Sequence, residues 1–323
     1  YFRVKSDPGY GKLSHLNLDD LESGNRTLRS QMDDDLKEDP ADFAVWKAAK
    51  PGEPYWDSPW GHGRPGWHIE CSAMARKHLG QTIDLHAGGQ DLIFPHHENE
   101  IAQSECANGC TFSRYWMHNG FLNINNEKMS KSAGNFFTVR EIAEKYGYEP
   151  IRYFMLTAGY RMPLNYTVEL IQSCKNSLER LYTCRDNLDF AIEHAHGADT
   201  ALAAKAGEAR AKFRKAMDDD LNTPDALAAI FDFVKEINTL SDGADKATLE
   251  QAAQVFDELT GVLGLLYNRK KDEVPPEVTA LVEERAAAKK AKDWGKADAI
   301  RARLTEMGWS VTDTAQGPKI AKL

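Results

Sequence analysis

The sequence predicts an α/β region followed by an all-α helical bundle and a small C-terminal α/β module. Three observations support this fold class. A strand pattern at residues 82–86 ends in a glycine-rich turn and leads to a helix, as in α/β folds. Apolar residues recur at helical spacing from Tyr166 onward. Near the C-terminus, a charged helical stretch turns at Gly308 into a strand pattern at residues 309–314.

Composition sets limits on this prediction. The chain has 323 residues, of which 42% are hydrophobic, so it is long enough for two or three domains with ordinary cores. Its net charge of -9 does not by itself predict a nucleic-acid-binding protein, although local patches can carry the opposite sign. No apolar run approaches the roughly 18 residues of a membrane span, so no membrane association is expected.

The cysteines are odd in number and scattered, at Cys71, Cys106, Cys110, Cys174 and Cys184. This spacing argues against a disulfide framework and favours a reducing cytoplasm. Cys106 and Cys110 have no second pair nearby, so we do not assign them as metal ligands.

The first part of the chain is expected to hold few regular elements. Residues 1–45 read as loops and short extended pieces, and the Gly and Pro residues of 51–66 predict an irregular loop. Trp56 and Trp60 in this loop could pack or line a pocket, and packing is the expected role. The elements expected next are a helix at 72–79, a buried strand at 82–86, and extended runs at 115–118 and 120–124.

The densest group of possible metal ligands lies within residues 67–100. It contains Cys71, His96 and Glu100, and a thiolate, an imidazole and a carboxylate are ligand types that bind zinc. His96 and Glu100 would share one face of a helix that begins near Pro95, because residues four apart stack on adjacent turns. A solvated helical pair would also explain these two residues. The surrounding polar and aromatic side chains favour a three-ligand site with an open position.

A second polar motif, KMSKSAGN, occupies residues 128–135. Lys128 and Lys131 could place two ammonium groups around a polyphosphate, and a loop would let them follow the phosphates as bonds break. A solvated basic turn would explain a generic lysine pair, but the string KMSKS is far more specific.

From Tyr166 the predicted structure is helical. One apolar face of a long helix is predicted by Ile171, Cys174, Leu178, Leu181, Leu188 and Ile192. Further helices are expected at residues 201–217, 223–240 and 247–267, the second of them capped by Asn222. Residues 270–276 read as a linker.

The last segment combines positive charge with aromatic side chains. Residues 281–323 contain nine Lys and Arg against six Asp and Glu, a net +3 in an acidic protein. We expect one charged helix over residues 286–308, and with Trp294 and Trp309 it is a candidate RNA-contacting surface. A solvated helix packed on the bundle is the alternative.

Three strings together closely resemble the cysteinyl-tRNA synthetase family, which belongs to the class I aminoacyl-tRNA synthetases. They are GWHIECSAM at 66–74, FPHHENEIAQSE at 94–105 and KMSKSAGNFF at 128–137. AMDDDLNTPDALA at 216–228 and KAKDWGKADAIRARLTEMG at 290–308 also resemble that family, so the resemblance covers the chain. KMSKS alone indicates only a class I synthetase, whereas the Cys71, His96 and Glu100 set indicates cysteine.

The resemblance implies four domains or parts of domains. Residues 1–50 would be the end of a connecting insertion, and 51–166 the second half of a Rossmann-like class I catalytic domain. Residues 167–270 would be a helical bundle that contacts the tRNA stem, and 277–323 an anticodon-binding module.

The resemblance also implies a zinc site. The family holds zinc with two cysteines, a histidine and a glutamate, and the matching positions here are Cys71, His96 and Glu100, for one Zn2+ per chain. Zinc bound to the substrate thiolate would distinguish cysteine from serine, because a soft thiolate binds zinc better than a neutral hydroxyl does. The substrate pocket is expected to include Trp67, His86 and Asp91.

The KMSKS motif implies a role with ATP. Lys128 and Lys131 would be catalytic, because they would stabilise the pyrophosphate leaving group when the carboxylate of L-cysteine attacks ATP. Lys128, Met129, Ser130 and Lys131 would contact ATP, which would bind with Mg2+. The cysteinyl-adenylate would then pass cysteine to the 3′ end of tRNA(Cys). A cytoplasmic monomer is expected.

The sequence departs from the family pattern at both ends. No His-Ile-Gly-His ATP motif and no further cysteine ligand precede Cys71, and HLGQ at 78–81 lies on the wrong side of it. The first residues do not form a signal peptide, and the chain begins without Met as if in mid-domain, so we expect a fragment. Without the ATP motif it should be inactive alone. Residues 318–323 lack the tryptophan and arginines frequent in the family.

Two other functions stay open from the sequence. One is a ligase that joins cysteine to a small amine, which would have no use for an anticodon-binding tail. The other is a non-catalytic tRNA-binding remnant, which would be consistent with the missing ATP motif.

Overall fold

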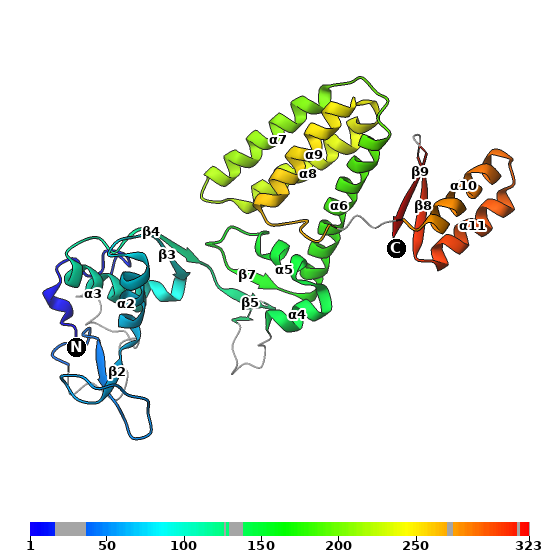
Figure 1. Cartoon of the computed structure of the whole chain (residues 1–323). Helices are drawn as coiled ribbons and strands as arrows, with labels where there is room; N and C mark the ends of the chain where they lie inside the picture. The colour runs from blue at the N-terminus through cyan, green and yellow to red at the C-terminus, as the bar shows by residue number, and fades with distance from the viewer. Residues whose placement is uncertain (17–36, 126, 129–137, 270–273, 315–316, 323) are drawn as a thin grey trace. The chain divides into compact units, whose positions relative to one another are not determined.

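The structure is a computed structural model that describes the chain except residues 17–36, 126, 129–137, 270–273, 315–316 and 323. The chain divides into two compact units (Figure 1). Unit 1 consists of Tyr1–Asn123 with Tyr160–Asn165, and unit 2 consists of Ile124–Gly159 with Tyr166–Leu323. Among the residues described, we find no helix with the length and hydropathy that a membrane crossing requires.

Unit 1 is built around two parallel strands, β3 (Ile83–Gly89) and β4 (Ser113–Asn119). The connection between them passes through the turns η4 (Gln90–Leu92) and η5 (Ile93–His97) and then helix α3 (Glu98–Asn108). Parallel strands need such a crossover connection, so the predicted α/β arrangement is confirmed here. Helix α2 (Trp67–Leu79) packs against α3, and the short helix η1 (Val4–Ser6) lies near the N-terminus (Figure 1).

Two predictions for these elements are wrong in detail. The strand at 82–86 is not fully buried: Ile83 is 5% exposed but Leu85 is 51% exposed, because β3 pairs only with β4 among the described strands. Helix α2 begins at Trp67 instead of residue 72. Its inward face in the first turns carries His68 and Ser72, both buried, so polar side chains interrupt the apolar periodicity there.

A short hairpin precedes α2. Strand β1 (Trp46–Ala48) pairs antiparallel with β2 (Gly63–Pro65), so part of the predicted irregular loop at 51–66 is a strand. A Cβ atom on Gly63 would lie 2.3 Å from Trp46 Nε1, and one on Gly66 would lie 2.0 Å from the Ala44 carbonyl oxygen. Only glycine therefore allows this close approach.

The prediction that Trp56 and Trp60 pack inside the protein is wrong. Their side chains are 58% and 79% exposed. Backbone hydrogen bonds within the loop's own turns and between Trp56 and Gly63 of β2 hold its shape without burying the two rings.

Three short strands, β5 (Leu122–Ile124), β6 (Glu127–Lys128) and β7 (Leu164–Tyr166), form a sheet in the order β6–β5–β7. The extended runs predicted at 115–118 and 120–124 lie in β4 and β5. Helices α4 (Val139–Tyr146) and α5 (Tyr148–Met155) follow β6 in the chain. A capping box between Thr138 and Glu141 starts α4.

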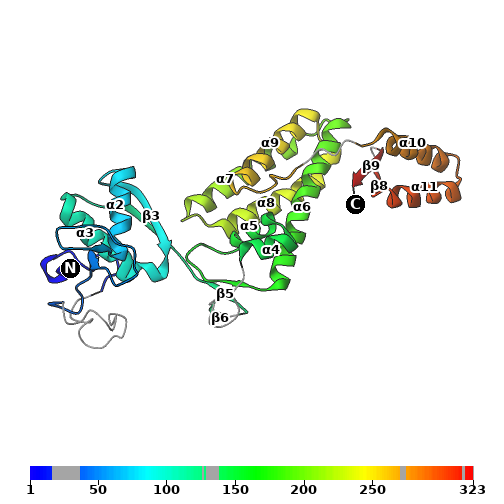
Figure 2. The ribbon, with the colours of Figure 1, turned by 60° about the horizontal axis from the view of Figure 1, so that its bottom comes forward.

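Unit 2 contains a bundle of four helices, α6 (Val168–Glu193), α7 (Ala201–Asp218), α8 (Thr223–Leu240) and α9 (Lys246–Val262), with η6 (Ser241–Gly243) between the last two (Figures 1 and 2). Helix α7 packs against α8 and α9, and α6 packs against α9. The predicted stripe of α6 is confirmed, since Ile171, Leu181 and Leu188 are each 0% exposed.

The ends of the bundle helices follow local chemistry. The side chain of Asn222 accepts a hydrogen bond from the Asp225 backbone N–H at 3.1 Å, so it caps α8 as predicted. Helix α9 ends at Val262, five residues before the predicted end. Gly264 has φ +65°, which leaves the right-handed helical region and which glycine adopts without steric cost.

The C-terminal module contains helices α10 (Pro276–Lys290) and α11 (Trp294–Glu306) and the antiparallel hairpin β8 (Trp309–Thr314) and β9 (Gly317–Lys322) (Figure 2). The single helix predicted over 286–308 is wrong. Lys292 has φ +60°, and the Asp293 side chain accepts a hydrogen bond from the Lys296 backbone N–H at 3.0 Å, so a new helix starts there. The strand predicted at 309–314 is confirmed.

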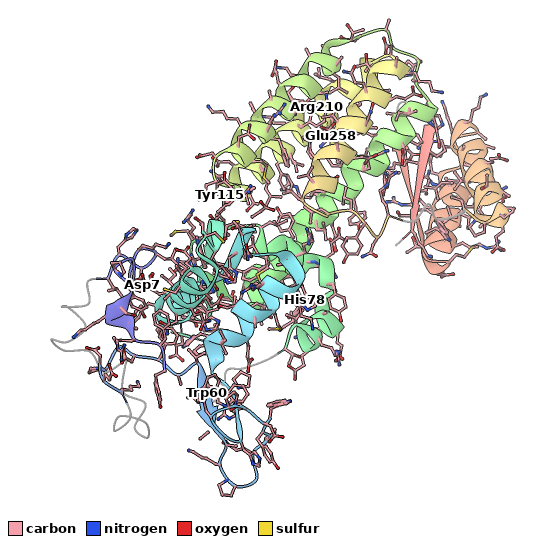
Figure 3. The ribbon with its side chains drawn as sticks, turned by 60° about the vertical axis from the view of Figure 1, so that its left-hand side comes forward. Asp7, Trp60, His78, Tyr115, Arg210 and Glu258 are labelled. Carbon is pink, nitrogen blue, oxygen red and sulfur yellow. The ribbon has the colours of Figure 1, made fainter. Side chains whose placement is uncertain are left out.

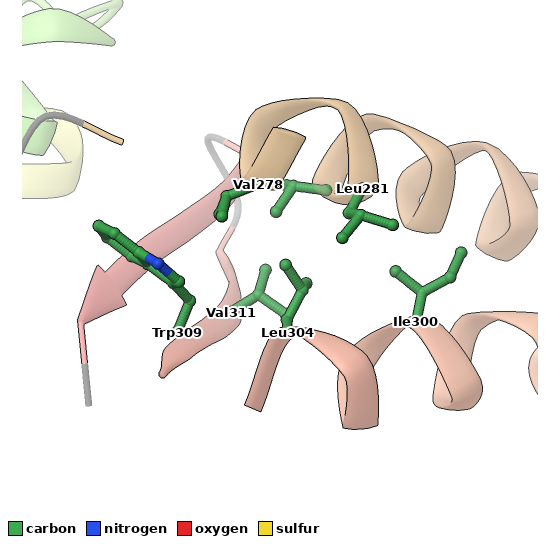
Figure 4. Close-up of a cluster of buried hydrophobic side chains, with 7 residues drawn as sticks. Val278, Leu281, Ile300, Leu304, Trp309 and Val311 are labelled. Atoms are coloured by element: carbon green, nitrogen blue, oxygen red, sulfur yellow. The ribbon is translucent and has the colours of Figure 1, made fainter. Parts of the chain in front are cut away.

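This module has its own core. It is formed by Val278, Leu281, Val282, Ile300, Leu304, Trp309 and Val311 (Figure 4). A buried Arg285 fixes the hairpin to α10 through an ion pair with Asp313, at 2.8 Å between Arg285 Nη1 and Asp313 Oδ1. A core this small leaves the module only a modest margin of stability.

Replacing Leu304, which is 1% exposed, with alanine should unfold this module. Truncation of a buried leucine typically costs ~2–5 kcal/mol, a large part of the stability of so small a unit. Hydrogen exchange in α10 and α11 is the measurement, and exchange in α6–α9 should stay unchanged. The matched control is Arg301→Ala on the exposed side of α11. Full protection of α10 in Leu304→Ala would contradict the expectation.

Candidate functional site

The three predicted metal ligands come together around the buried side chain of Glu100. Glu100 lies in α3 and is 0% exposed, His96 lies in the turn η5, and Cys71 lies in α2. His96 Nε2 is 2.6 Å from Glu100 Oε1 and 3.7 Å from Cys71 Sγ. One ligand atom from each of the three residues lies within 4.8 Å of the others, so a single cation could contact all three.

The Glu100 carboxylate supports this reading because no hydrogen bond of standard geometry reaches its oxygens from the described residues. Both oxygens are buried, and His96 Nε2 lies 2.6 Å from Oε1 and His86 Nε2 lies 3.0 Å from Oε2. Buried polar atoms in folded proteins are almost always satisfied. Short nitrogen–oxygen distances without hydrogen-bond geometry are expected where ligands converge on a cation, and this donor set fits zinc.

The electrostatics of the three ligands are consistent with a cation. Burial alone would raise the pKa of Glu100, but the adjacent His86 and His96 hold that pKa at about 2, so the carboxylate is ionised. Burial, together with the negative charge of Glu100, raises the pKa of the Cys71 thiol. A bound cation would reverse this second effect, because a coordinating thiol is deprotonated.

A second group of possible ligands shares Glu100. His86 Nε2 lies 3.0 Å from Glu100 Oε2, and the ligand atoms of His86, His97 and Glu100 also lie within 4.8 Å of one another. His97 Nδ1 is 2.9 Å from His118 Nε2. Burial lowers the pKa of His97 to about 4, so its ring is neutral near pH 7. The structure alone thus allows a cation on either side of Glu100.

Sequence reasoning missed His97 and His118 as members of this cluster. The adjacent histidines in FPHHENE were a signal for His97, since both rings of such a pair can turn inward from an irregular turn. No pattern in the sequence pointed to His118, which lies on β4 and reaches His97 only through the β3–β4 pairing.

Neighbouring side chains hold the His96 ring in place. His68 Nδ1 lies 2.8 Å from His96 Nδ1, which leaves His96 Nε2 directed at Cys71 and Glu100. Burial lowers the pKa of His68 to about 4. Gln103 Nε2 donates to the His68 carbonyl oxygen at 2.6 Å and to Ser72 Oγ at 2.7 Å, which joins α3 to α2.

The predicted substrate residues occupy different positions. The Trp67 ring stacks on His96 with centroids 4.4 Å apart and stays 59% exposed, and His86 contacts Glu100. Asp91 is exposed in η4 and belongs to neither group of possible ligands. A cavity of about 200 Å³ lies beside the site, lined by Phe43, Trp67, His68 and Asn99 among others, and includes none of the three ligands.

The KMSKS motif is only partly within the described structure. Lys128 is the last residue of β6. Met129, Ser130 and Lys131 lie outside the described residues. Their assignment to ATP therefore stays a prediction from the sequence.

Known families match three consecutive parts of the chain. Residues 1–176 match the class I (C) catalytic domain of tRNA synthetases. Residues 212–267 match the DALR domain. Residues 271–318 match the anticodon-binding domain of cysteinyl-tRNA ligase.

Curated relatives resemble the chain over its whole length. The cysteine–tRNA ligase of Caldicellulosiruptor saccharolyticus is 55% identical over 328 residues, an alignment that covers 100% of this chain and 70% of that protein. The cysteine–tRNA ligase of Clostridioides difficile is 50% identical, with 99% of this chain and 69% of that protein covered.

A solved structure confirms the fold class. It is the ternary LeuRS–tRNA–LeuAMS complex from Agrobacterium radiobacter K84, which superposes with a TM-score of 0.52 over 66% of this chain and 34% of that one. The sequence identity is 14%, so this likeness concerns the fold alone. It agrees with the predicted α/β fold followed by helices.

Proposed function

The chain belongs to the cysteinyl-tRNA synthetase family, and from this premise we propose that it serves the ATP-dependent attachment of L-cysteine to tRNA(Cys). The observation that carries the proposal is the convergence of the Cys71 sulfur, the His96 imidazole and the Glu100 carboxylate, whose ligand atoms all lie within 4.8 Å of one another. These residues would hold one zinc ion.

The zinc site would provide the selectivity for cysteine. When bound, zinc supplies a soft Lewis acid that prefers a thiolate to a hydroxyl, which separates cysteine from serine better than shape can. Glu100 brings a negative charge to the site, and His68 keeps the His96 ring in position. Trp67, His86 and Asp91 are the proposed contacts to the rest of the substrate. The exposed face of Trp67 supports its assignment.

The proposed ATP chemistry rests on the KMSKS motif. Lys128 and Lys131, with Met129 and Ser130, would bind the phosphates of ATP together with Mg2+. Their two ammonium groups would offset the charge that builds up on pyrophosphate when the cysteine carboxylate attacks the α-phosphate. Cysteine would then move from the adenylate to the 3′ end of the tRNA.

We propose that the domains have the bounds expected from the sequence. We keep 1–50 as the end of the connecting insertion, 51–166 as the second half of the catalytic domain, 167–270 as the stem-contacting bundle and 277–323 as the anticodon-binding module. The matches at residues 212–267 and 271–318 support the last two.

Transfer to tRNA is favoured over transfer to a small amine. The match of residues 271–318 to an anticodon-binding domain carries this choice, because a ligase with a small acceptor has no use for such a module. We propose a monomer in the cytoplasm, where the five free cysteines would stay reduced.

The complete gene product that contains this sequence is expected to charge tRNA(Cys) with cysteine and to reject serine. The measurement is incorporation of labelled amino acid into tRNA(Cys), with a second tRNA species as the control. Cysteine transfer to a small amine at the same rate, or to no acceptor at all, would refute the proposed function.

A further inference from the structure

Three large aromatic side chains of unit 1 are exposed on one loop. The loop joins β1 to β2, and Tyr55, Trp56 and Trp60 in it are 54%, 58% and 79% exposed. We call these three residues the aromatic platform. Trp60 lies in the part of unit 1 that contains the β1–β2 loop (Figure 3). Three exposed aromatic side chains on one short loop are a candidate binding surface, because scattered single exposure is common and several on one segment are not.

The backbone of this loop is held in one shape. Trp56 N–H donates to the Gly63 carbonyl oxygen at 2.8 Å, and Gly63 N–H donates back to the Trp56 carbonyl oxygen at 3.0 Å. Ser58 Oγ donates to the Gly61 carbonyl oxygen at 2.6 Å and closes the turn beside Trp60. The aromatic platform is therefore presented by a fixed scaffold, which lowers the entropy lost when a ligand binds.

The amino-acid composition of the loop favours a ligand with flat aromatic rings. Between β1 and β2 there is no Leu, Ile, Val or Met, only aromatic, small, Pro and polar residues. The Tyr55 ring already stacks in parallel on His62, with centroids 4.3 Å apart and 16° between the planes. Nucleobases stack on aromatic side chains in this way, and the contact tolerates any base because every base has a π face.

The local charge suits a nucleic acid as well. Over residues 46–65 the chain carries three basic side chains, Lys47, Lys50 and Arg64, against two acidic ones, Glu53 and Asp57. Arg64 Nε lies 3.4 Å from Glu53 Oε2, so these two charges offset each other, and the remaining excess of one positive charge contrasts with the net charge of -9 of the whole protein. Cations beside stacking rings are the combination that binds single-stranded nucleic acids.

The position of the loop in the chain indicates which part of a nucleic acid it would meet. Strand β2 leads through Gly66 directly into α2, which begins with Trp67 and carries Cys71 one turn later. The aromatic platform is thus anchored to the element that supplies one ligand of the candidate metal site. In the proposed function, the unpaired 3′ end of the tRNA has to reach the cysteine held at this site.

We propose that Tyr55, Trp56 and Trp60 stack on the unpaired nucleotides at the 3′ end of the tRNA as it approaches the cysteine pocket. This inference rests on the proposed function and adds a surface for that substrate. The platform orients the tRNA end and takes no part in the chemistry. Its contribution appears only for a tRNA whose unpaired 3′ nucleotides are present.

The test compares the affinity of the chain for intact tRNA(Cys) and for the same tRNA without its unpaired 3′ nucleotides. Trp60→Ala should weaken binding of the intact form by about 5- to 150-fold for each stacked base, and leave binding of the shortened form unchanged. Trp60→Phe should retain most of the affinity, because a phenyl ring still stacks. The matched control is Tyr115→Ala in β4, since Tyr115 is 70% exposed and lies at the opposite end of unit 1 in Figure 3.

Several outcomes would overturn the inference. If Trp60→Ala binds both tRNA forms as tightly as the wild type, or binds both equally more weakly, the platform does not stack on the 3′ nucleotides. Loss of self-association in Trp60→Ala, seen by sedimentation, would make the platform a protein interface. A wild-type chain that binds tRNA(Cys) no better than another tRNA would instead refute the proposed function, so the two failures are distinguishable.

Discussion

Replacing Cys71 with serine is expected to lower the zinc affinity of the chain by at least about a hundred-fold. Loss of a residue that hydrogen-bonds to a metal ligand commonly lowers the metal affinity by about 10- to 100-fold. Loss of a ligand itself should lower the metal affinity further. Cys71 Sγ, His96 Nε2 and Glu100 Oε1 are close enough for one cation, so no single member is redundant. The measurement is zinc competition with a coloured chelator, with metal analysis of the purified chain.

A second variant separates the two possible cation positions. His97→Gln removes a member of the group that lies on the other side of Glu100 and leaves Cys71 and His96 in place. If the proposed zinc site is correct, this variant keeps most of its zinc. Cobalt in place of zinc gives an independent reading, because a thiolate-to-metal absorption band should be present in the wild type and absent in Cys71→Ser. Zinc retained in Cys71→Ser and lost in His97→Gln would move the site to His86, His97 and Glu100.

Replacing Phe256 with alanine is expected to destabilise the helical bundle by ~3–5 kcal/mol. Phe256 is 0% exposed on α9, the helix that packs against both α6 and α7. Its removal leaves a cavity that the rigid neighbouring helices cannot fully close. The measurement is the free energy of opening of α7–α9 from hydrogen exchange in denaturant, which isolates the bundle from the rest of the chain.

The matched control is Val262→Ala at the end of the same helix. Val262 is 58% exposed, so its truncation should change the free energy of opening by less than about 0.5 kcal/mol. An effect of Phe256→Ala as small as that of the control would mean that α9 is not part of the bundle core.

The bundle was the part most completely predicted from the sequence. In α6 one face packs on neighbouring helices and the other meets water, so burial follows the periodicity of the apolar residues. The cap at Asn222 was equally readable, because capping depends only on residues three positions apart. The break between α10 and α11 was missed, since it occurs at Lys292 in a left-handed conformation that lysine rarely adopts.

The burial or exposure of single aromatic side chains was harder to predict. A tryptophan has a strong average tendency to be buried, and on that basis Trp56 and Trp60 were expected inside. Their exposure depends on the direction of the loop, which is set where Gly63 passes close to Trp46 and Gly66 passes close to Ala44. No local sequence pattern encodes that direction.

By itself, the sequence determined the class of the protein and the chemical types in its site. Helix periodicity, caps and the strings around Cys71, His96, Glu100 and KMSKS depend on residues close in the chain, so they can be read without coordinates. Only the tertiary structure decided that Cys71 on α2 reaches His96 and Glu100, and that His86, His97 and His118 gather on the other side of the same carboxylate. Cys71 is 25 positions from His96 in the sequence, and His97 is 21 positions from His118. These contacts form because β3 pairs with β4 and α2 packs on α3, and such long-range packing leaves no periodic trace in the sequence.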